Sequence, residues 1–561
     1  MGVNVPGLIV MLLFYLLVLG TGIWASRKSK RATEKRSANW TDDALLGNRG
    51  ISLAVGVFTT TATYIGGGFI VGISELVYTP TRGLVWTVMP VAAIIAFIVG
   101  GIFYAKKMRQ GKYVTMMDPI QSQFGKAVSV VLSVALLVSD VFWVTATLIG
   151  LGSTMSIILD LSYNLCIWIS AAVAVTYTLF GGLYSVAYTD IVQLILTFVS
   201  LWLCVPFVLM SEHSLDITQS ALNFTYQDPW VGSVDTDRVW TWLDELLVLT
   251  FCILGSQEFH QRMLSASSPT TARLSCFIAA PLMIIFAIPS VLIGAVAVST
   301  DWNQTSYGSP SPYERDEASY ILPLVLQHLT PSYVSVIGIG AVGAAVMSST
   351  DSGLLSAASI FSSNLYKNML RSNASEREMQ WVVRITVVLV GVVGTSLTLL
   401  NNSIMVFWLV GADITYIFTF PALTCALFCE FSNGYGAIMG VFIALLLRVL
   451  SGEPEFGLPA VLHYPGGTVK DGMYIQRAPV STICMLSNLL ATIFFSYLTS
   501  LLFNRGILPQ SWDILGVKRR QTSQELTSTN NCKTNDVNTE EIRETETDHM
   551  IETSPLETSS L

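Results

Sequence analysis

The stretch TTTATYIGGGFI, residues 59–70, decides the fold because it places three consecutive glycines inside an apolar segment at 50–74. Backbone N–H and C=O groups inside a bilayer must find partners within the protein. A glycine run there is costly unless the opened backbone lines a cavity or is buried in protein. One interpretation is a helix broken at Gly66, Gly67 and Gly68 to form a binding site. The other is a close crossing of two membrane helices through small residues.

The composition around this stretch is that of a membrane protein. The chain has 561 residues, of which 52% are hydrophobic and only 12% are charged, with a mean hydropathy of +0.58, whereas soluble domains carry roughly 25% charged residues. The net charge of -8 gives no indication of a nucleic-acid partner, and the eight cysteines show no spacing typical of zinc sites. We predict an all-α polytopic protein in contact with membrane lipid.

Apolar runs long enough to cross a hydrocarbon core of roughly 30 Å recur along the chain. We predict about 13 transmembrane helices, at 7–25, 50–74, 84–106, 126–159, 163–181, 184–210, 240–261, 273–299, 331–366, 381–401, 404–429, 434–450 and 480–503.

Basic residues predict the orientation, because Lys and Arg accumulate on the cytoplasmic side of membranes. Alternate connections contain 24 of the 30 basic residues. We therefore expect an extracellular N-terminus and a cytoplasmic C-terminus. Glycosylation triplets at Asn223 and Asn303 fall in the predicted extracellular loops, and Asn303 is the better candidate. The polar tail at 511–561 is predicted to be disordered and cytoplasmic.

A second interrupted segment favours the binding-site interpretation of the glycines. The span at 240–261 is broken at Gly255 and Ser256 and ends in a polar run, five spans after the first break. Broken helices at corresponding positions of two halves indicate an inverted-repeat transporter with a central site. We expect an extra N-terminal helix (1–25), a cytoplasmic loop (26–49), two inverted repeats (50–210 and 240–429), extracellular loops (211–239 and 300–330) and two final helices (430–510).

The ninth span presents candidate cation ligands. It carries a hydroxyl stripe at helical spacing, with Ser348 and Asp351 one turn apart. Small hydroxyl residues often only pack helices. An acid within a membrane span, however, faces the interior and usually marks an ion pathway. Hydroxyls, a carboxylate and carbonyls from the unwound segment at 62–68 are the oxygen ligands that sodium prefers.

The fourth span places Asp140, Trp143 and Thr147 on one face. An anion beside an indole face suits a cation, and especially a quaternary ammonium, which cannot donate a hydrogen bond. Tyr64 would complete the cage if the two spans meet. The alternative is a core tryptophan beside an acid that reaches the surface.

Two motifs carry a resemblance to a known family. Residues 181–193, GGLYSVAYTDIVQ, resemble the signature of the sodium/solute symporter family, and residues 344–349, AAVMSS, resemble its sodium-site helix. Within that family, residues 113–119, 299–307 and 448–454 are similar to the high-affinity choline transporters. The resemblance covers roughly residues 5–510.

This resemblance implies a LeuT-like five-plus-five inverted repeat and sodium- and chloride-dependent uptake. The implied sodium ligands are the carbonyls of Ala62, Ile65 and Ala345 and the hydroxyls of Ser348 and Ser349, with Asp351 nearby. The implied substrate-binding positions are Tyr64, Ala93, Asp140, Trp143 and Ser256. Aromatic residues are expected at positions 93 and 256, so half of the aromatic cage is missing. Two lost cation–π contacts could weaken choline binding by about one to three powers of ten.

The sequence thus predicts a sodium-coupled, chloride-dependent symporter that imports choline across the plasma membrane, and no enzyme. The alternative is a divergent paralogue in the same family with another small organic solute, and a channel or receptor is a more distant rival. The resemblance also implies a role in neurotransmitter biosynthesis. Presynaptic or endosomal vesicles are further expected locations, and trafficking adaptors are expected partners of the tail.

Overall fold

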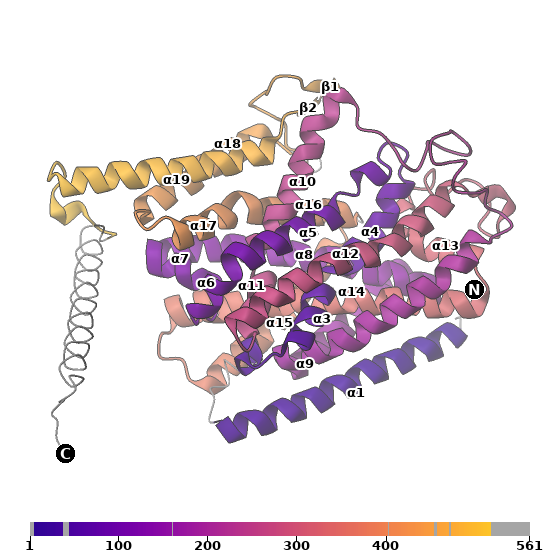
Figure 1. Cartoon of the computed structure of the whole chain (residues 1–561), viewed down its shortest axis with the longest axis horizontal. Coiled ribbons are helices and arrows are strands. Elements are labelled where there is room, and N and C mark those ends of the chain that lie inside the picture. The colour runs from indigo at the N-terminus through magenta and orange to yellow at the C-terminus, as the bar shows by residue number, and fades with distance from the viewer. Residues whose placement is uncertain are drawn as a thin grey trace, which may run out of the picture.

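The structure is a computed structural model that describes residues 5–36, 44–159, 161–401, 403–453, 457–470, 473–515 and 517. Its helices run side by side along the long axis of the molecule (Figure 1). The expected helical architecture is confirmed, because the two described strands, β1 (Thr468–Lys470) and β2 (Met473–Ile475), form only a short antiparallel hairpin. The tail from residue 518 onward lies outside the described residues.

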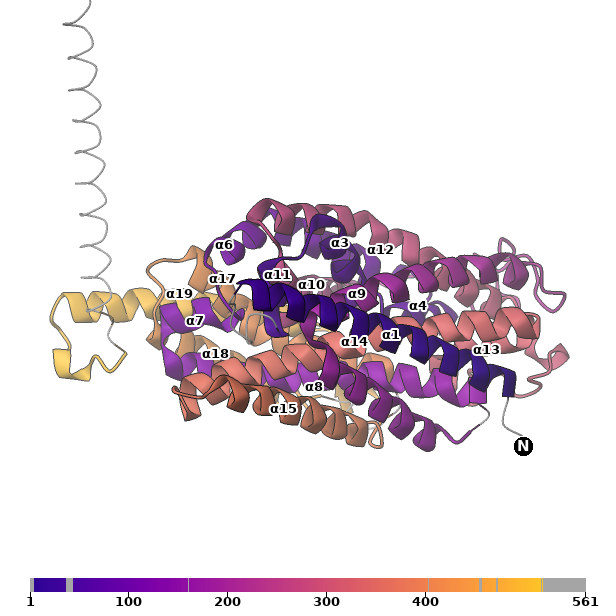
Figure 2. The same cartoon turned by 90° about the horizontal axis from the view of Figure 1, so that it is seen from below.

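The helices of the first half follow the predicted spans closely. α1 (Val5–Arg36) lies along the outside against α9, as Figure 2 shows. After it come η1 (Gly47–Arg49), α3 (Leu53–Tyr64), α4 (Gly67–Tyr78), η2 (Leu84–Trp86), α5 (Met89–Val99), η3 (Gly100–Tyr104), α6 (Ala105–Gln110), α7 (Met117–Phe124), α8 (Lys126–Leu159) and α9 (Tyr163–Leu209).

The second half and the C-terminal helices complete the bundle. Their order is η4 (Thr236–Arg238), α10 (Val239–Leu254), α11 (Gln257–Ser265), α12 (Pro269–Val298), η5 (Trp302–Gln304), η6 (Ala318–Tyr320), α13 (Ile321–Leu329), α14 (Ser332–Ile360), η7 (Phe361–Leu370), α15 (Glu376–Leu397), α16 (Ile404–Ile414), η8 (Thr415–Thr419), α17 (Phe420–Phe428), α18 (Gly434–Ser451), α19 (Val480–Asn504) and η10 (Gln510–Trp512).

The expected count of 13 spans is not confirmed. Within the described residues, 11 helices are long and apolar enough to cross a membrane, or 12 if the bent pair α3 and α4 is one span. The difference lies in the segments predicted at 163–181 and 184–210, which α9 contains as two helical parts on either side of a kink at Gly182, where φ is 64°. Its apolar first part, Tyr163–Thr176, is shorter than a full membrane crossing.

The glycine run breaks the second span as expected. α3 ends at Tyr64 and α4 begins at Gly67, with a bend of 47° between them. The same glycines also let α14 approach closely. A Cβ atom on Gly66 would lie 1.9 Å from Ser349 Oγ, and one on Gly67 would lie 3.0 Å from a methyl group of Val346. The glycine run therefore both breaks the helix and allows a close crossing of two helices.

The second break, between α10 and α11, is stabilised by side chains that satisfy the freed carbonyls. His260 Nε2 lies 2.7 Å from the carbonyl oxygen of Leu254, and Thr419 Oγ1 donates to the carbonyl of Gly255 at 2.9 Å. Such partners are what non-helical backbone needs at membrane depth. The polar run after the break is therefore part of the structure that keeps the helix open.

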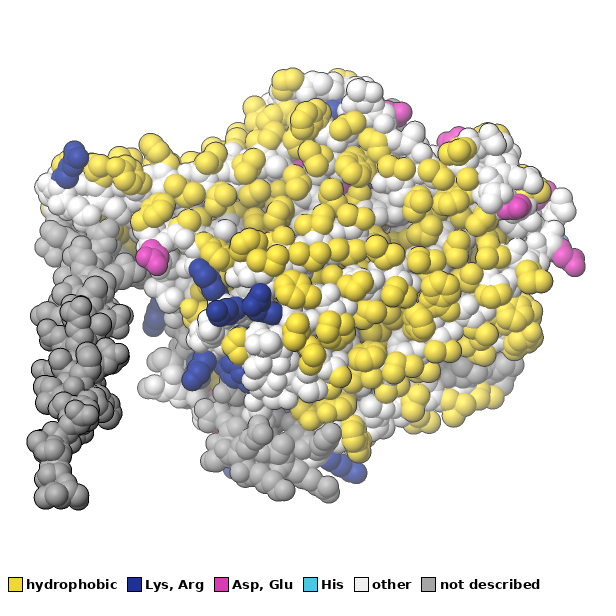
Figure 3. Space-filling view, viewed as in Figure 1, with side chains coloured by type: hydrophobic (Ala, Val, Ile, Leu, Met, Phe, Trp, Pro, Cys, Tyr) yellow, Lys and Arg dark blue, Asp and Glu magenta, His cyan; other side chains and the backbone are white. Residues whose placement is uncertain are grey.

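The surface has an apolar belt with charge at its ends. Figure 3 shows hydrophobic side chains covering the middle of one face, Lys and Arg gathered near α6 and α11, and most of the visible Asp and Glu at the opposite end. Asn223 and Asn303 are exposed in the loops between α9 and α10 and between α12 and α13.

Candidate functional site

The five residues predicted to bind substrate line one cavity. Tyr64 comes from the end of α3, Ala93 from α5, Asp140 and Trp143 from α8, and Ser256 from the break between α10 and α11. The space between the lining side chains, counted together with the open solvent at its mouth, is about 660 Å³. Both broken spans therefore contribute to one pocket, because the breaks bring their opened ends together.

Four aromatic rings form walls of this pocket. The rings of Tyr64 and Trp143 have centroids 6.2 Å apart and an angle of 70° between their planes, and Trp143 and Trp408 are 5.9 Å apart at 67°. Phe69 also lines the cavity. Phe69 and Trp408 were not predicted. The expected loss of aromatic side chains at Ala93 and Ser256 therefore leaves more of a cage than the sequence indicated.

Two acidic side chains lie in the pocket, and one of them was not predicted. Asp140 is 2% exposed and its Oδ2 accepts a hydrogen bond from Ser356 Oγ at 2.9 Å. Glu258, in the first turn of α11, is 5% exposed, and its carboxyl group contacts that of Asp140. Asp140 is thus held inside the protein by α14. The alternative of an acid that reaches the surface is wrong.

The hydroxyl stripe of α14 faces the break in the second span. Ser349 Oγ donates to the carbonyl oxygen of Thr63 at 3.0 Å and lies directly against Gly66. The carbonyl of Ala345 is also near Gly66, 3.7 Å from where a Cβ atom would be. The carbonyls of Ala62 and Ile65 belong to the same last turn of α3. Carbonyl and hydroxyl oxygens of this kind are ligands for a hard cation.

A second, smaller cavity joins this oxygen-rich face to the substrate pocket. Its lining includes Ser349 and Gly66. Tyr64, Trp143 and Trp408 line both cavities. A cation at the break and a solute in the pocket would therefore lie on two sides of the same aromatic side chains.

The carboxylate nearest the hydroxyls of α14 is different from the one predicted. Asp351 points toward α9, where its Oδ1 accepts a hydrogen bond from Thr178 Oγ1 at 2.6 Å. Asp190, in the signature motif of α9, instead accepts from Ser348 Oγ and Thr59 Oγ1, each at 2.5 Å. Ser348 therefore links the predicted cation face to Asp190, and Asp351, one turn further along the same face of α14, contacts α9 at Thr178.

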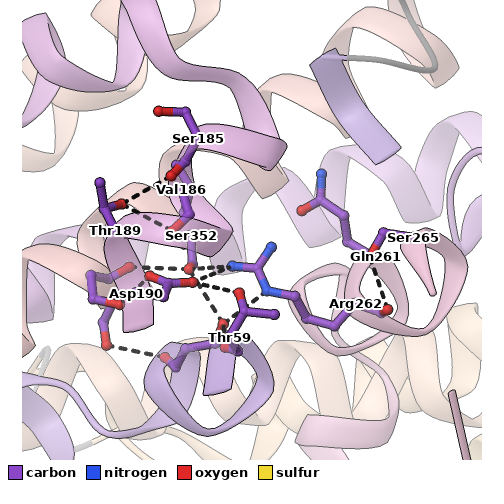
Figure 4. A network of polar contacts seen from close by, with 12 residues as sticks. Thr59, Ser185, Val186, Thr189, Asp190, Gln261, Arg262, Ser265 and Ser352 are labelled. Carbon is purple, nitrogen blue, oxygen red and sulfur yellow. Dashed lines mark hydrogen bonds and ion pairs between the residues drawn. The ribbon is translucent and has the colours of Figure 1, made fainter. Parts of the chain in front are cut away.

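A buried arginine joins this cluster to the second broken span (Figure 4). Arg262 of α11 donates from Nε to Thr63 Oγ1 at 3.1 Å and from Nη2 to Ser352 Oγ at 2.7 Å, and Nη2 lies 3.7 Å from Asp190 Oδ2. Arg262 and Asp190 have fully buried side chains. These contacts connect α3, α9, α11 and α14, the helices that would have to separate if the protein opened on this side.

The residues that sequence reasoning missed carry no local pattern. Trp408 lies in an apolar segment in which a tryptophan is most simply a core residue. Glu258 and Arg262 were visible as members of a polar run at a span end, but their partners lie on other helices. Within the described ranges, no group of three or more His, Cys, Asp or Glu side chains could hold a metal ion. The candidate cation face consists of carbonyls and hydroxyls instead.

Comparison with known proteins agrees with this geometry. A family model described as the sodium:solute symporter family matches residues 45–444. The human high affinity choline transporter 1 is 44% identical over 546 residues, which cover 97% of this chain and 93% of the relative. The same-named protein of Torpedo marmorata is 44% identical, covering 94% of this chain and 91% of the relative. That of Caenorhabditis elegans is 40% identical, covering 91% and 88%.

A solved structure confirms the fold. A sodium-coupled sialic acid symporter in an outward-open state matches with a TM-score of 0.67 at 16% identity, covering 88% of this chain and 98% of the symporter chain. The expected LeuT-like architecture and the resemblance to the choline transporters are confirmed, and the relatives are transporters rather than enzymes. The chain belongs to the sodium:solute symporter family.

Proposed function

We propose that this protein is a sodium-coupled symporter that imports choline. The observation that carries the proposal is one buried pocket, lined by aromatic rings and a carboxylate, that adjoins the oxygen-rich face of α14 at the glycine break. The relatives named as choline transporters support the assignment of the substrate.

The pocket matches the chemistry of a quaternary ammonium. Such a cation has no N–H group, so it is recognised by aromatic faces and by negative charge. Tyr64, Trp143 and Trp408 stand roughly perpendicular to their neighbours and present several ring faces and edges to one space. Asp140 supplies the charge at the same place.

The sodium ion would couple the two cavities. Its proposed ligands are the carbonyls of Ala62, Ile65 and Ala345 and the hydroxyls of Ser348 and Ser349. A cation held there joins the broken second span to α14 and fixes Tyr64 at the edge of the substrate pocket. Sodium would thus stabilise the outward-open state and raise the affinity for substrate, because the two sites share one conformation. Substrate entry then closes the outer side, and the repeats rock to release both solutes inside.

Asp351 would act on this site from a distance, through the α14–α9 contact. Its Oδ1 is held by Thr178, and no partner for Oδ2 is found within the described parts of the chain. We assign Asp351 to positioning α14 against α9 rather than to direct ligation of sodium.

The cellular setting is proposed from the family and from charge. Chloride dependence rests on resemblance to the choline transporters. We place the protein in the plasma membrane with its N-terminus outside and its C-terminus inside, because the basic residues gather at one end of the bundle (Figure 3). Glycans at Asn303 and Asn223, vesicular pools and tail-binding adaptors belong to the same proposal.

A second candidate is import of another small organic solute by the same mechanism. Ala93 and Ser256 leave space and a hydroxyl where large aromatic residues are expected. Competition by a panel of amines, sugars and carboxylates separates the two candidates.

The decisive test is radiolabelled choline uptake by oocytes that express the protein at the surface, with sodium replaced by lithium in a matched batch. Saturable uptake that needs sodium supports the proposal. Ala93→Tyr and Ser256→Trp should strengthen choline transport by adding ring faces to the pocket. Gly20→Ala on the outer helix α1 is a control, since nothing lies within 4 Å of the position that the new Cβ atom would take. Absence of sodium-dependent uptake, despite surface expression, would refute the assignment of choline.

A further inference from the structure

The substrate pocket contains an acid pair rather than one acid. Glu258 enters from α11, Asp140 enters from α8, and their carboxyl groups are in contact. Two carboxylates in contact at a buried site repel each other unless a cation or a proton lies with them. The pocket therefore offers more carboxyl oxygens as hydrogen-bond acceptors than a single quaternary ammonium requires.

The hydroxyl groups around the pocket already donate hydrogen bonds to acceptors within the protein. The Ser256 hydroxyl has one proton and finds acceptors within the protein at the carbonyl oxygen of Ile253, 2.9 Å away, and at Tyr64 Oη, 3.0 Å away. Ser139 and Thr415 lie 2.7 Å apart and also reach a backbone carbonyl of α16. These hydroxyls have no proton left for a ligand. What they and the acid pair can offer a ligand is oxygen lone pairs.

Within the described residues, no Lys or Arg side chain forms an ion pair with either carboxyl group of the acid pair. Arg262 lies one turn beyond Glu258 on α11, but its nitrogens contact Thr63, Ser352 and Asp190. The direct contacts of the guanidinium are therefore with the cluster on the other side of the break, and its charge acts on Glu258 only through space. A ligand that brings both positive charge and hydrogen-bond donors would complement the pair.

We infer that this pocket accepts organic cations that carry N–H donors, the less methylated relatives of choline, and that Glu258 sets the preference for them over a quaternary ammonium. The inference rests on the proposed uptake of a choline-like cation and specifies its chemical class. A protonated tertiary or secondary amine places its methyl groups against Trp143 and Trp408 and donates its N–H to a carboxylate. Charge-assisted hydrogen bonds of this kind are strong and discriminate against ligands that lack the donor.

The test is a methylation series on the full-length protein in oocytes. Sodium-dependent uptake of radiolabelled choline is inhibited by unlabelled choline, N,N-dimethylethanolamine, N-methylethanolamine and ethanolamine, with the neutral isostere 3,3-dimethyl-1-butanol as a blank. The wild type should bind at least one N–H amine as tightly as choline or more tightly. Glu258→Ala should weaken that amine about tenfold relative to choline. Glu258→Gln, which keeps the shape of the side chain, should also lower the ratio of the affinity for that amine to the affinity for choline.

The outcomes separate this inference from the proposed function. If choline uptake is sodium-dependent but every N–H amine is at least tenfold weaker than choline, the inference is wrong and the proposed function stands. An unchanged ratio in both Glu258 variants also overturns it. If no uptake is seen, thermal stabilisation of the purified protein by each amine still reports the preference. Stabilisation by N–H amines without uptake would overturn only the proposed function, and stabilisation by none of them would overturn the inference.

Discussion

Replacing Gly66 by alanine should damage the cation site by steric force alone. The backbone of Gly66 is extended, with φ at -121°, so an alanine adopts it without strain. Its Cβ, however, would lie 1.9 Å from Ser349 Oγ and 2.5 Å from Ser349 Cβ. Carbon atoms prefer roughly 3.5–4.0 Å, so α14 and the break have to separate by about 1 Å or more.

That separation removes the 3.0 Å hydrogen bond from Ser349 to the carbonyl of Thr63 and pulls the proposed sodium ligands apart. Overpacking of this kind costs about 1–3 kcal/mol. If this cost applies to the sodium-bound state, the sodium concentration for half-maximal uptake rises about 5- to 150-fold. We expect this rise at constant surface expression.

The assay is choline uptake as a function of sodium concentration in oocytes, normalised to surface protein by biotinylation. Gly68→Ala is the matched control within the same glycine run, because its Cβ would lie at an ordinary 3.5 Å from Trp408. Its sodium dependence should stay within about threefold of wild type. Equal sodium dependence in Gly66→Ala and wild type would refute the assignment of this face as the sodium site.

Three further predictions concern the rest of the chain. Asp190→Asn leaves the buried Arg262 without its carboxylate partner, which costs about 3–5 kcal/mol. Thermal unfolding of the purified protein should therefore show a large loss of stability. An unfolding midpoint equal to that of the wild type would contradict the role of this pair. Arg448→Gln breaks the ion pairs with Asp413 and Glu453, which are partly exposed. The loss of folding stability should therefore be smaller, about 1 kcal/mol or less. A larger loss of stability than in Asp190→Asn would contradict this order of the two variants. Asn303→Gln should give a faster-migrating band that glycosidase no longer shifts, and a band still shifted as in wild type would exclude glycosylation there.

Much of the architecture was readable along the sequence because it depends on local properties. Apolar runs fix which segments can enter a bilayer, and the glycines at 66–68 and 255 mark where a helix must open. The motifs at 181–193 in α9 and at 344–349 in α14 indicated the family. The exception was the fifth predicted span, at 163–181, because its apolar helix before the kink at Gly182 is shorter than a full membrane crossing.

The composition of the site was readable only in part. Tyr64, Asp140 and Trp143 were found because each lies near a break or on a marked helical face. Trp408 was missed because its neighbours in the sequence are apolar, and its role depends on α16 lying against α8. Similarly, the sequence did not reveal that Asp190, rather than the expected Asp351, accepts the hydrogen bond from Ser348, because this contact depends on helix packing. Both acids lie where α9 meets α14, and the packing of the two helices decides which hydroxyl each acid accepts from, which periodicity cannot specify.

The sequence by itself determined that this chain spans a membrane with two opened helices and belongs to a family of symporters, since these properties follow from hydrophobicity, glycine placement and motif. The tertiary structure alone decided which side chains meet inside. It brought Glu258 to Asp140, Arg262 to Asp190 and a fourth aromatic ring to the pocket. Such contacts join residues more than 70 positions apart, and only the packing of the helices sets the distances between them.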